Sequence, residues 1–226
     1  VTKYIGGHGT TIGGVIIDSG KFDWLKHASQ HPTFNTPDPS YHGAIWSTLV
    51  PEALGVPIAY ALRARVVLLR DLGAALSPTN AFYLIQGLET LPLRYRAHQE
   101  NASAVAGFLE QHEAVASVNH PSLFTGIQKE RADKYLTTGY GPIIGIELKE
   151  GIEAGRKFID NLKLLYHVAN IGDARSLAIH PASTTHSQLS EQEQIKAGVT
   201  PGYVRLAIGI EHKDDIITDI SQALAA

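Results

Sequence analysis

A lysine stands beside a glycine-rich stretch at the beginning of the sequence. Lys3 follows Thr2, and five glycines occur within residues 6–14. Glycines let a backbone approach another group closely, and a lysine amine that has lost its proton is a nucleophile toward carbonyl carbons. The hydroxyl of Thr2 is a candidate ligand for a phosphate. No Gly-Lys-Ser/Thr closes the pattern, so the stretch is not a nucleotide-binding loop. On spacing alone, a plain solvated lysine remains the alternative.

Other residue types that perform catalysis are scattered through the chain. His180 and His186 are six positions apart, not the three or four that share a helix face, and no His-Glu-x-x-His occurs, so we expect no metal site. His8 belongs to the glycine-rich loop, where a structural role is expected. The sequence holds no cysteine and no Gly-x-Ser-x-Gly motif, which excludes a cysteine nucleophile and disfavours a serine hydrolase.

Composition indicates a globular protein that acts on small molecules. The 226 residues are 44% hydrophobic and 18% charged, with a formal net charge of -3 and no long run of one sign. This charge pattern predicts no nucleic-acid partner and no membrane partner. Without cysteines, a signal peptide or an apolar run of membrane length, the chain is predicted to be cytoplasmic. The sequence has no methionine and begins inside a motif, so we expect a fragment of a longer protein.

The elements that must position the lysine fall into two regions. In the first, a β-branched run at residues 13–20 predicts a short buried strand, and residues 30–41, rich in proline, predict either a loop bordering the site or a plain surface connection. Residues 55–70 have a helical pattern, and a further helix is expected to start at Ser77-Pro78. That helix is expected to continue to residue 111 with a bend at Pro92, where we place a domain boundary.

The second region is predicted to form a small α/β domain, with helices covering a sheet. We expect its strands at residues 115–118, 142–148, 177–179 and 204–210, and its helices at residues 153–166 and 214–225.

Five blocks together resemble one family. Thr2-Lys3-Tyr4-Ile5-Gly6-Gly7-His8-Gly9, followed by Gly13-Gly14, resembles the cofactor-lysine motif of the Cys/Met metabolism family of pyridoxal-phosphate enzymes. Four further blocks occur in the family's order: Leu76-Ser77-Pro78-Thr79-Asn80-Ala81, Gly87-Leu88-Glu89-Thr90-Leu91, His180-Pro181-Ala182-Ser183-Thr184-Thr185-His186 and Val204-Arg205-Leu206-Ala207-Ile208-Gly209-Ile210-Glu211.

The resemblance implies a fold, a cofactor and residue roles. The fold would be α/β, of the aspartate aminotransferase-like type I that binds pyridoxal 5'-phosphate. Residues 1–91 would be the C-terminal part of its large cofactor-binding domain, and residues 92–226 its complete small domain. Lys3 would form the Schiff base with the cofactor and shuttle protons, Thr2 would bind the phosphate, and Arg205 would hold the substrate α-carboxylate.

Within the family, two features resemble the O-acetylhomoserine sulfhydrylases. Asn170 stands where the cystathionine and methionine γ-lyase branches more often carry serine, and residues 22–60 resemble the longer sulfhydrylase version of this segment. Asn170 would help orient the substrate carboxylate, although a turn residue before Gly172 is the alternative. The implied reaction is γ-replacement in methionine biosynthesis, in which O-acetylhomoserine and sulfide give homocysteine and acetate.

The resemblance also implies groups that these 226 residues do not contain. Family members have roughly another half-chain before the lysine, and they are commonly homotetramers. We therefore expect the missing N-terminal segment and further copies of the chain as partners, with the isolated chain inactive. Cystathionine γ-synthase, a γ-lyase of the same family, and a non-catalytic C-terminal assembly module remain as alternatives.

Overall fold

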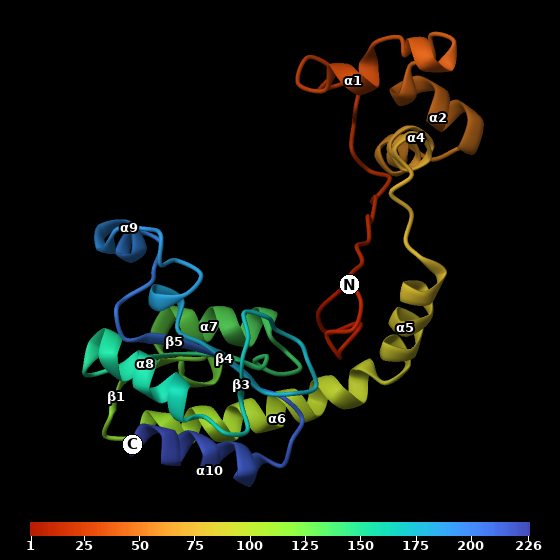
Figure 1. Ribbon diagram of the computed structural model, residues 1–226. Helices are drawn as coiled ribbons and strands as arrows, with labels where there is room; N and C mark the ends of the chain where they lie inside the picture. Colours follow the sequence, from red (N-terminus) through yellow and green to blue (C-terminus); the bar gives the residue numbers. More distant parts are fainter. The chain divides into compact units, whose positions relative to one another are not determined.

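The computed structural model describes all residues from Val1 to Ala226 and divides into two compact units. The lysine-bearing unit contains residues 1–12 and 82–226, and the helical unit contains residues 13–81. The first twelve residues therefore belong with the C-terminal part of the chain (Figure 1). A boundary between domains at residues 91 and 92 stays a prediction.

The helical unit has a small aromatic core. Trp46, Val50 and Ala59 are buried in it, and the indole nitrogen of Trp46 donates a hydrogen bond to Asp38 Oδ2 at 2.9 Å. Its elements are α1 (Pro32–Asn35), η1 (Pro39–Tyr41), α2 (Trp46–Leu54), α3 (Ala59–Arg63), the π-helical η2 (Ala64–Leu69) and α4 (Arg70–Leu72). The helix predicted at 55–70 thus begins later and contains a π-helical segment.

The buried strand predicted at residues 13–20 is wrong. The segment forms no strand, and the side chains of Val15, Ile16 and Ile17 are 64%, 54% and 86% exposed. An apolar β-branched run favours extended backbone, but a strand exists only when a neighbouring strand supplies hydrogen bonds. No such neighbour lies beside this segment within its unit.

Two helices follow where one bent helix was predicted. Helix α5 (Pro78–Glu89) begins as expected, with Asn80 N donating to Ser77 Oγ at 3.1 Å. The break falls at Thr90, and α6 (Leu91–Glu110) starts there with Pro92 in its first turn. A proline in the first turn removes no helical hydrogen bond, so it begins this helix instead of bending it.

A five-stranded sheet forms the centre of the lysine-bearing unit. Its strand order is β1-β2-β5-β4-β3, and every neighbouring pair is antiparallel except β3 and β4. The strands are β1 (Val115–Asn119), β2 (Ile143–Leu148), β3 (Tyr166–His167), β4 (Leu177–Ile179) and β5 (Tyr203–Ala207). Four of these strands match predicted runs, whereas β3, with two residues, was not predicted.

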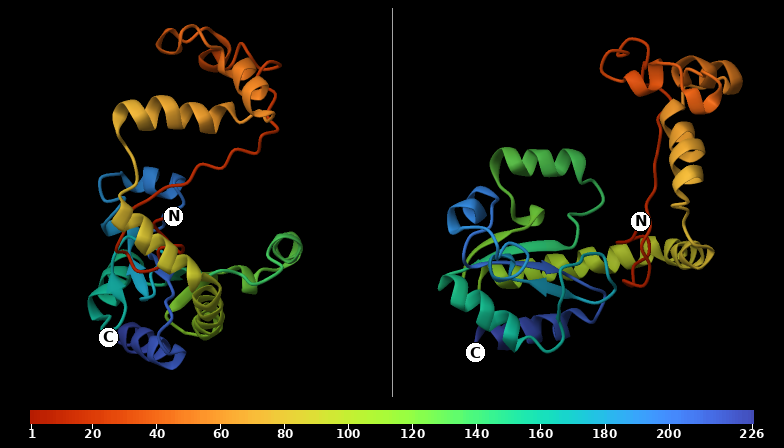
Figure 2. Two further views of the ribbon diagram at one scale, coloured as in Figure 1. Left: turned by 90° about the vertical axis from the view of Figure 1, so that its right-hand side faces the viewer. Right: turned by 45° about the horizontal axis from the view of Figure 1, so that its top comes forward.

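Three helices share one apolar core with this sheet. Helices α6, α8 (Gly151–Asn161) and α10 (Lys213–Leu224) lie together on one side of it, and α7 (Gly126–Tyr135) and α9 (Glu191–Lys196) lie on the other (Figures 1 and 2). The core includes Leu109, Ile144, Phe158, Leu206 and Ile220. Short 3₁₀ turns η3 (Pro121–Leu123) and η4 (Pro181–Ser183) complete the unit. None of the helices has the length and apolar character that a membrane crossing requires.

Candidate active site

Lys3 lies in a tight turn of residues 1–7, the lysine turn, which backbone hydrogen bonds close. Gly7 N donates a hydrogen bond to Lys3 O at 2.8 Å, and Gly6 N donates to Val1 O at 3.1 Å. Gly7 has a φ of 77°, in the left-handed region that favours glycine. The turn leaves the Lys3 side chain exposed while Gly6 and Gly7 are buried.

The structure brings three residues expected at the site together. Lys3 Nζ donates to Asn170 Oδ1, and Arg205 Nη2 donates to the backbone oxygen of Asn170 at 3.3 Å. Arg205 comes from β5, whereas Asn170 lies in the loop between β3 and β4. The Nε atom of Arg205 is buried without a hydrogen-bond partner. An amine, an amide and a guanidinium with spare donor capacity thus converge, a combination suited to an amino-acid carboxylate.

Close backbone contact holds the Asn170 loop against the lysine turn. Gly172 has a φ of 74°, and a Cβ atom there would lie 2.6 Å from Tyr4 N. Ala174 N donates to Gly7 O at 2.8 Å. Only glycine fits at position 172, so its presence keeps Asn170 within reach of Lys3.

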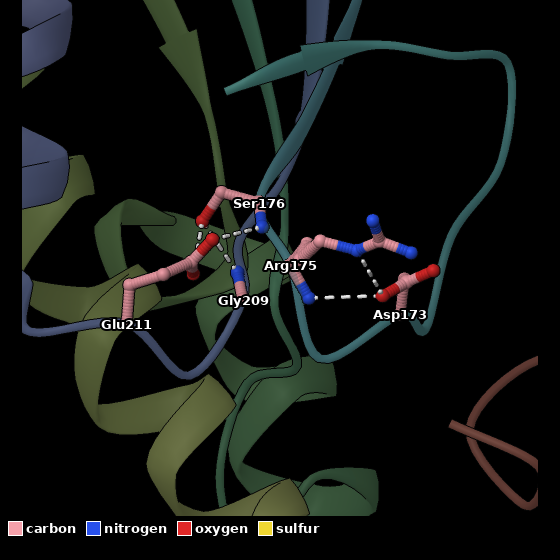
Figure 3. A network of polar contacts seen from close by, with 5 residues as sticks. All are labelled: Asp173, Arg175, Ser176, Gly209 and Glu211. Atoms are coloured by element: carbon pink, nitrogen blue, oxygen red, sulfur yellow. Dashed lines mark hydrogen bonds and ion pairs between the residues drawn. The ribbon is translucent and has the colours of Figure 1, made fainter. Parts of the chain in front are cut away.

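A buried polar network fixes the other end of the Asn170 loop (Figure 3). The Glu211 carboxylate accepts hydrogen bonds from Ser176 N at 2.7 Å and Ser176 Oγ at 2.9 Å, and Ser176 Oγ accepts from Gly209 N at 2.8 Å. Nearby, Asp173 Oδ1 accepts from Arg175 N at 3.0 Å. Because Ser176 is fully buried and uses its hydroxyl as both donor and acceptor, it ties the loop to the chain that follows β5.

The ring of Tyr4 is enclosed next to Lys3. It meets the rings of Tyr95 and His98 edge-on, with centroids 5.4 Å and 5.8 Å away. Burial, aided by Tyr95, raises the pKa of Tyr4 to about 12, so its phenol stays neutral. Burial lowers the pKa of His98, whose Nδ1 lies 2.6 Å from Ile208 O. Since a carbonyl only accepts, Nδ1 carries the proton of the neutral ring.

Several residues that shape the site were not predicted. Glu211 and Gly209 belong to the block of residues 204–211 that resembles the family, but their hydrogen bonds were not predicted. Arg94 was also missed, although it follows Thr90 by four positions, a spacing that places two side chains on one helix face.

Thr2 adjoins Lys3 as the sequence requires, and its phosphate role stays a prediction. No three histidine or acidic side chains gather in a group that would hold a metal ion.

The residues present fit pyridoxal phosphate. The partner of Lys3 Nζ is a neutral amide and not a carboxylate, so no ion pair competes for the amine. The orphaned Nε of Arg205 leaves a buried donor for an anionic substrate group. Lys3 would hold the cofactor through its aldehyde carbon, with Thr2 beside it for the phosphate.

Comparison with known proteins gives the class to which this site belongs. The model of the family "Cys/Met metabolism PLP-dependent enzyme" matches residues 1–225. The chain therefore belongs to the Cys/Met metabolism family of pyridoxal-phosphate-dependent enzymes, and the resemblance described above is confirmed.

Within this family, the chain is similar to sulfhydrylases. It is 52% identical over 229 residues to an O-acetyl-L-homoserine sulfhydrylase of Leptospira meyeri, and 50% identical over 223 residues to a homocysteine synthase of Schizosaccharomyces pombe. Each alignment covers 99% of this chain and 51% of the relative. The chain thus spans about half the length of these curated relatives.

A solved structure supports the fold. A Campylobacter jejuni protein described as an O-acetylhomoserine (thiol)-lyase, containing N'-pyridoxyl-lysine-5'-monophosphate, matches with a TM-score of 0.87 and 43% identity. The match covers all of this chain and 52% of that chain. The predicted type I fold of pyridoxal-phosphate enzymes is therefore confirmed.

Proposed function

We propose that this chain carries the lysine-bearing part of an O-acetylhomoserine sulfhydrylase of methionine biosynthesis. The reaction breaks the ester C–O bond at the γ-carbon of O-acetylhomoserine and forms a C–S bond there with sulfide, giving homocysteine and acetate. The observation that carries the proposal is the meeting of Lys3, Asn170 and Arg205. The named relatives are about twice as long as this chain. We therefore expect residues from the additional length to take part in the reaction as well.

Each of the three residues has a role that follows from its chemistry. Lys3 Nζ takes the proton from the substrate α-carbon and returns protons to neighbouring carbons, because an amine released from its covalent bond is a general base. Arg205 binds the α-carboxylate through paired N–H donors. Asn170 orients both, since its amide oxygen meets Lys3 and its backbone oxygen meets Arg205. When bound, pyridoxal phosphate supplies the electron sink.

Asn170 also favours a sulfhydrylase over the other branches of the family. An asparagine side chain reaches farther than the serine expected in the γ-lyases and places an acceptor on the lysine amine. We expect sulfide and O-acetylhomoserine to be converted faster than cystathionine or methionine. Faster turnover of either of the latter two would assign the chain to another branch.

The first experiment tests whether Lys3 holds the cofactor. The chain is mixed with pyridoxal phosphate, and absorbance at ~420 nm is recorded for the parent, for Lys3→Ala and for Lys149→Ala as an exposed-lysine control. The band is expected in the parent and the control and is expected to be lost in Lys3→Ala. A parent chain that never acquires the band refutes catalysis by this polypeptide.

A non-catalytic assembly module is the second candidate. The exposed apolar side chains of Val15, Ile16 and Ile17 favour it, because a run of this kind is usually covered by another chain segment. Under this function the chain binds other segments of such an enzyme without performing chemistry. A parent chain that is stable and folded but never acquires the ~420 nm band would support it.

The assembly and location belong to the same proposal. A homotetramer in the cytoplasm is expected from the family resemblance and from the absence of cysteines, which suits a reducing compartment. Light scattering on the chain checks the expected tetramer.

A further inference from the structure

A buried arginine beside the lysine turn has only uncharged partners. Arg94, in the first turn of α6, is 6% exposed. Its guanidinium donates to Tyr4 O at 2.9 Å, Ile5 O at 3.3 Å and Gly87 O at 2.6 Å, and its Nε donates to Thr90 Oγ at 3.1 Å. Burial lowers the pKa of Arg94, as expected for a cation whose partners are all neutral. A buried charge held in this way is costly, so it calls for an explanation.

The surrounding backbone is shaped to receive this guanidinium. A Cβ atom on Gly7 would lie 2.2 Å from Arg94 Nη1, and a Cβ atom on Gly87 would lie 2.2 Å from Ile5 O. Both positions therefore require glycine. The lysine turn, the end of α5 and the start of α6 meet at backbone distance, with the guanidinium between them.

The carbonyl groups that Arg94 binds follow Lys3 directly. Tyr4 O and Ile5 O belong to the same turn whose Lys3 O accepts from Gly7 N. On its other side, the turn is held by the hydrogen bond from Ala174 N to Gly7 O. Fixing these carbonyls fixes the direction in which Lys3 leaves the backbone, and so the approach of its amine to Asn170.

We propose that Arg94 is a positioning residue that holds the cofactor lysine, Lys3, in line with Asn170 and Arg205. The inference rests on the proposed function for the role of Lys3, but the hydrogen bonds that carry it do not. A planar guanidinium reaches three carbonyls and a hydroxyl at once, whereas a lysine ammonium in the same place is a point charge on a flexible stem. Arg94→Lys therefore keeps the charge and loses the geometry.

The first test needs no cofactor. Amide hydrogen exchange is measured on the 226-residue chain for the parent, for Arg94→Lys and for Arg96→Lys, the exposed arginine two positions along α6. In Arg94→Lys, the amides of Gly7 and Ala174 are expected to exchange about tenfold faster or more, the amount that loss of one hydrogen bond produces. Amides of β5 are expected to be unchanged. Unchanged exchange at Gly7 and Ala174, or equal loss of protection in β5, overturns the proposal.

The second test reads the lysine itself. Each chain is treated with pyridoxal phosphate and borohydride, and covalent cofactor on Lys3 is compared with that on the exposed Lys149 by mass spectrometry. Arg94→Lys is expected to lower the ratio about tenfold or more while Arg96→Lys preserves it. An unchanged ratio in Arg94→Lys overturns the positioning role. A parent chain with no preference for Lys3 instead counts against the proposed function, and the exchange result then decides on Arg94 alone.

Discussion

The Nζ atom of Lys3 donates a hydrogen bond to Oδ1 of Asn170, although 167 positions separate the two residues in the chain. The contact depends on close backbone packing at Gly172 and on the hydrogen bond from Ala174 to Gly7. The lysine turn is therefore held at Tyr4 and at Gly7 by the loop between β3 and β4. Substitutions in that loop are expected to change the position of the Lys3 amine.

Asn170→Ser is expected to weaken the proposed reaction. Serine is too short to reach Lys3 Nζ from the same backbone position, so one polar contact at the amine is lost. For O-acetylhomoserine and sulfide, kcat/KM is expected to fall about tenfold, the equivalent of about 1.4 kcal/mol. Steady-state assays, made on the enzyme completed with its N-terminal segment, compare it with Asn119→Ser, an exposed control at the end of β1. Equal kcat/KM values in the parent and Asn170→Ser would contradict the prediction.

Ser176→Ala is expected to destabilise the lysine-bearing unit. It leaves the amide of Gly209 without its acceptor and removes one donor from Glu211. Leaving buried polar groups unsatisfied costs about 1–3 kcal/mol in the free energy of unfolding. Urea unfolding measures this cost, with Ser117→Ala on the exposed face of β1 as the control. A midpoint that moves no more than that of the control would show that the network carries no stability.

Gly7→Ala is expected to be strongly destabilising. Its Cβ atom would meet the Arg94 guanidinium at 2.2 Å, and φ at this position is 77°. Strain of this kind costs about 1–3 kcal/mol, with the clash in addition. Gly107→Ala in α6 is the matched control, because nothing lies within 4 Å of its Cβ position and alanine favours helix. Thermal unfolding should separate the two, with Tm lowered for Gly7→Ala and equal or raised for Gly107→Ala.

Acid is expected to destabilise the fold through His98. Burial lowers the pKa of His98 below its ordinary 6.5. Below pH 6.5, the imidazole of His98 therefore binds a proton more readily in the unfolded chain than in the folded chain. The free energy of unfolding therefore falls as pH drops below 6.5. His120 has a pKa lowered by burial and adds an effect of the same sign.

Substitution separates the contribution of His98 from that of His120. His98→Asn retains a donor for Ile208 O and does not titrate, so its stability should fall less between pH 7.5 and pH 5.5. Urea midpoints at both pH values, with exposed His8→Asn as the control, give the difference. Equal losses in the parent and His98→Asn would rule out this contribution.

Local signals in the sequence predicted much of the lysine-bearing unit. Ser77-Pro78 predicts the start of α5 because both residues act within one turn, and the apolar runs at 142–148 and 204–210 locate β2 and β5 because both strands are buried. The strand expected at 13–20 failed for the opposite reason. Its formation depends on hydrogen bonds from another strand, which local pattern does not contain.

The site was predictable only in part. Lys3, Asn170 and Arg205 were selected through resemblance, since no spacing rule places residues so distant in sequence side by side. Arg94 was not selected as a site residue, because a lone arginine in a helix usually lies in solvent. Its burial depends on glycine at position 7, which becomes informative only when the two backbones are seen together.

Residues 1–12 belong to the same compact unit as residues 82–226. The site should therefore stay assembled even when the chain that links these two segments is cut. A protease that cuts the chain once between residues 13 and 81 would leave the Lys3 peptide attached by noncovalent contacts, among them those of Arg94 and Ala174. The nicked protein would then release this peptide under denaturant and retain it in buffer.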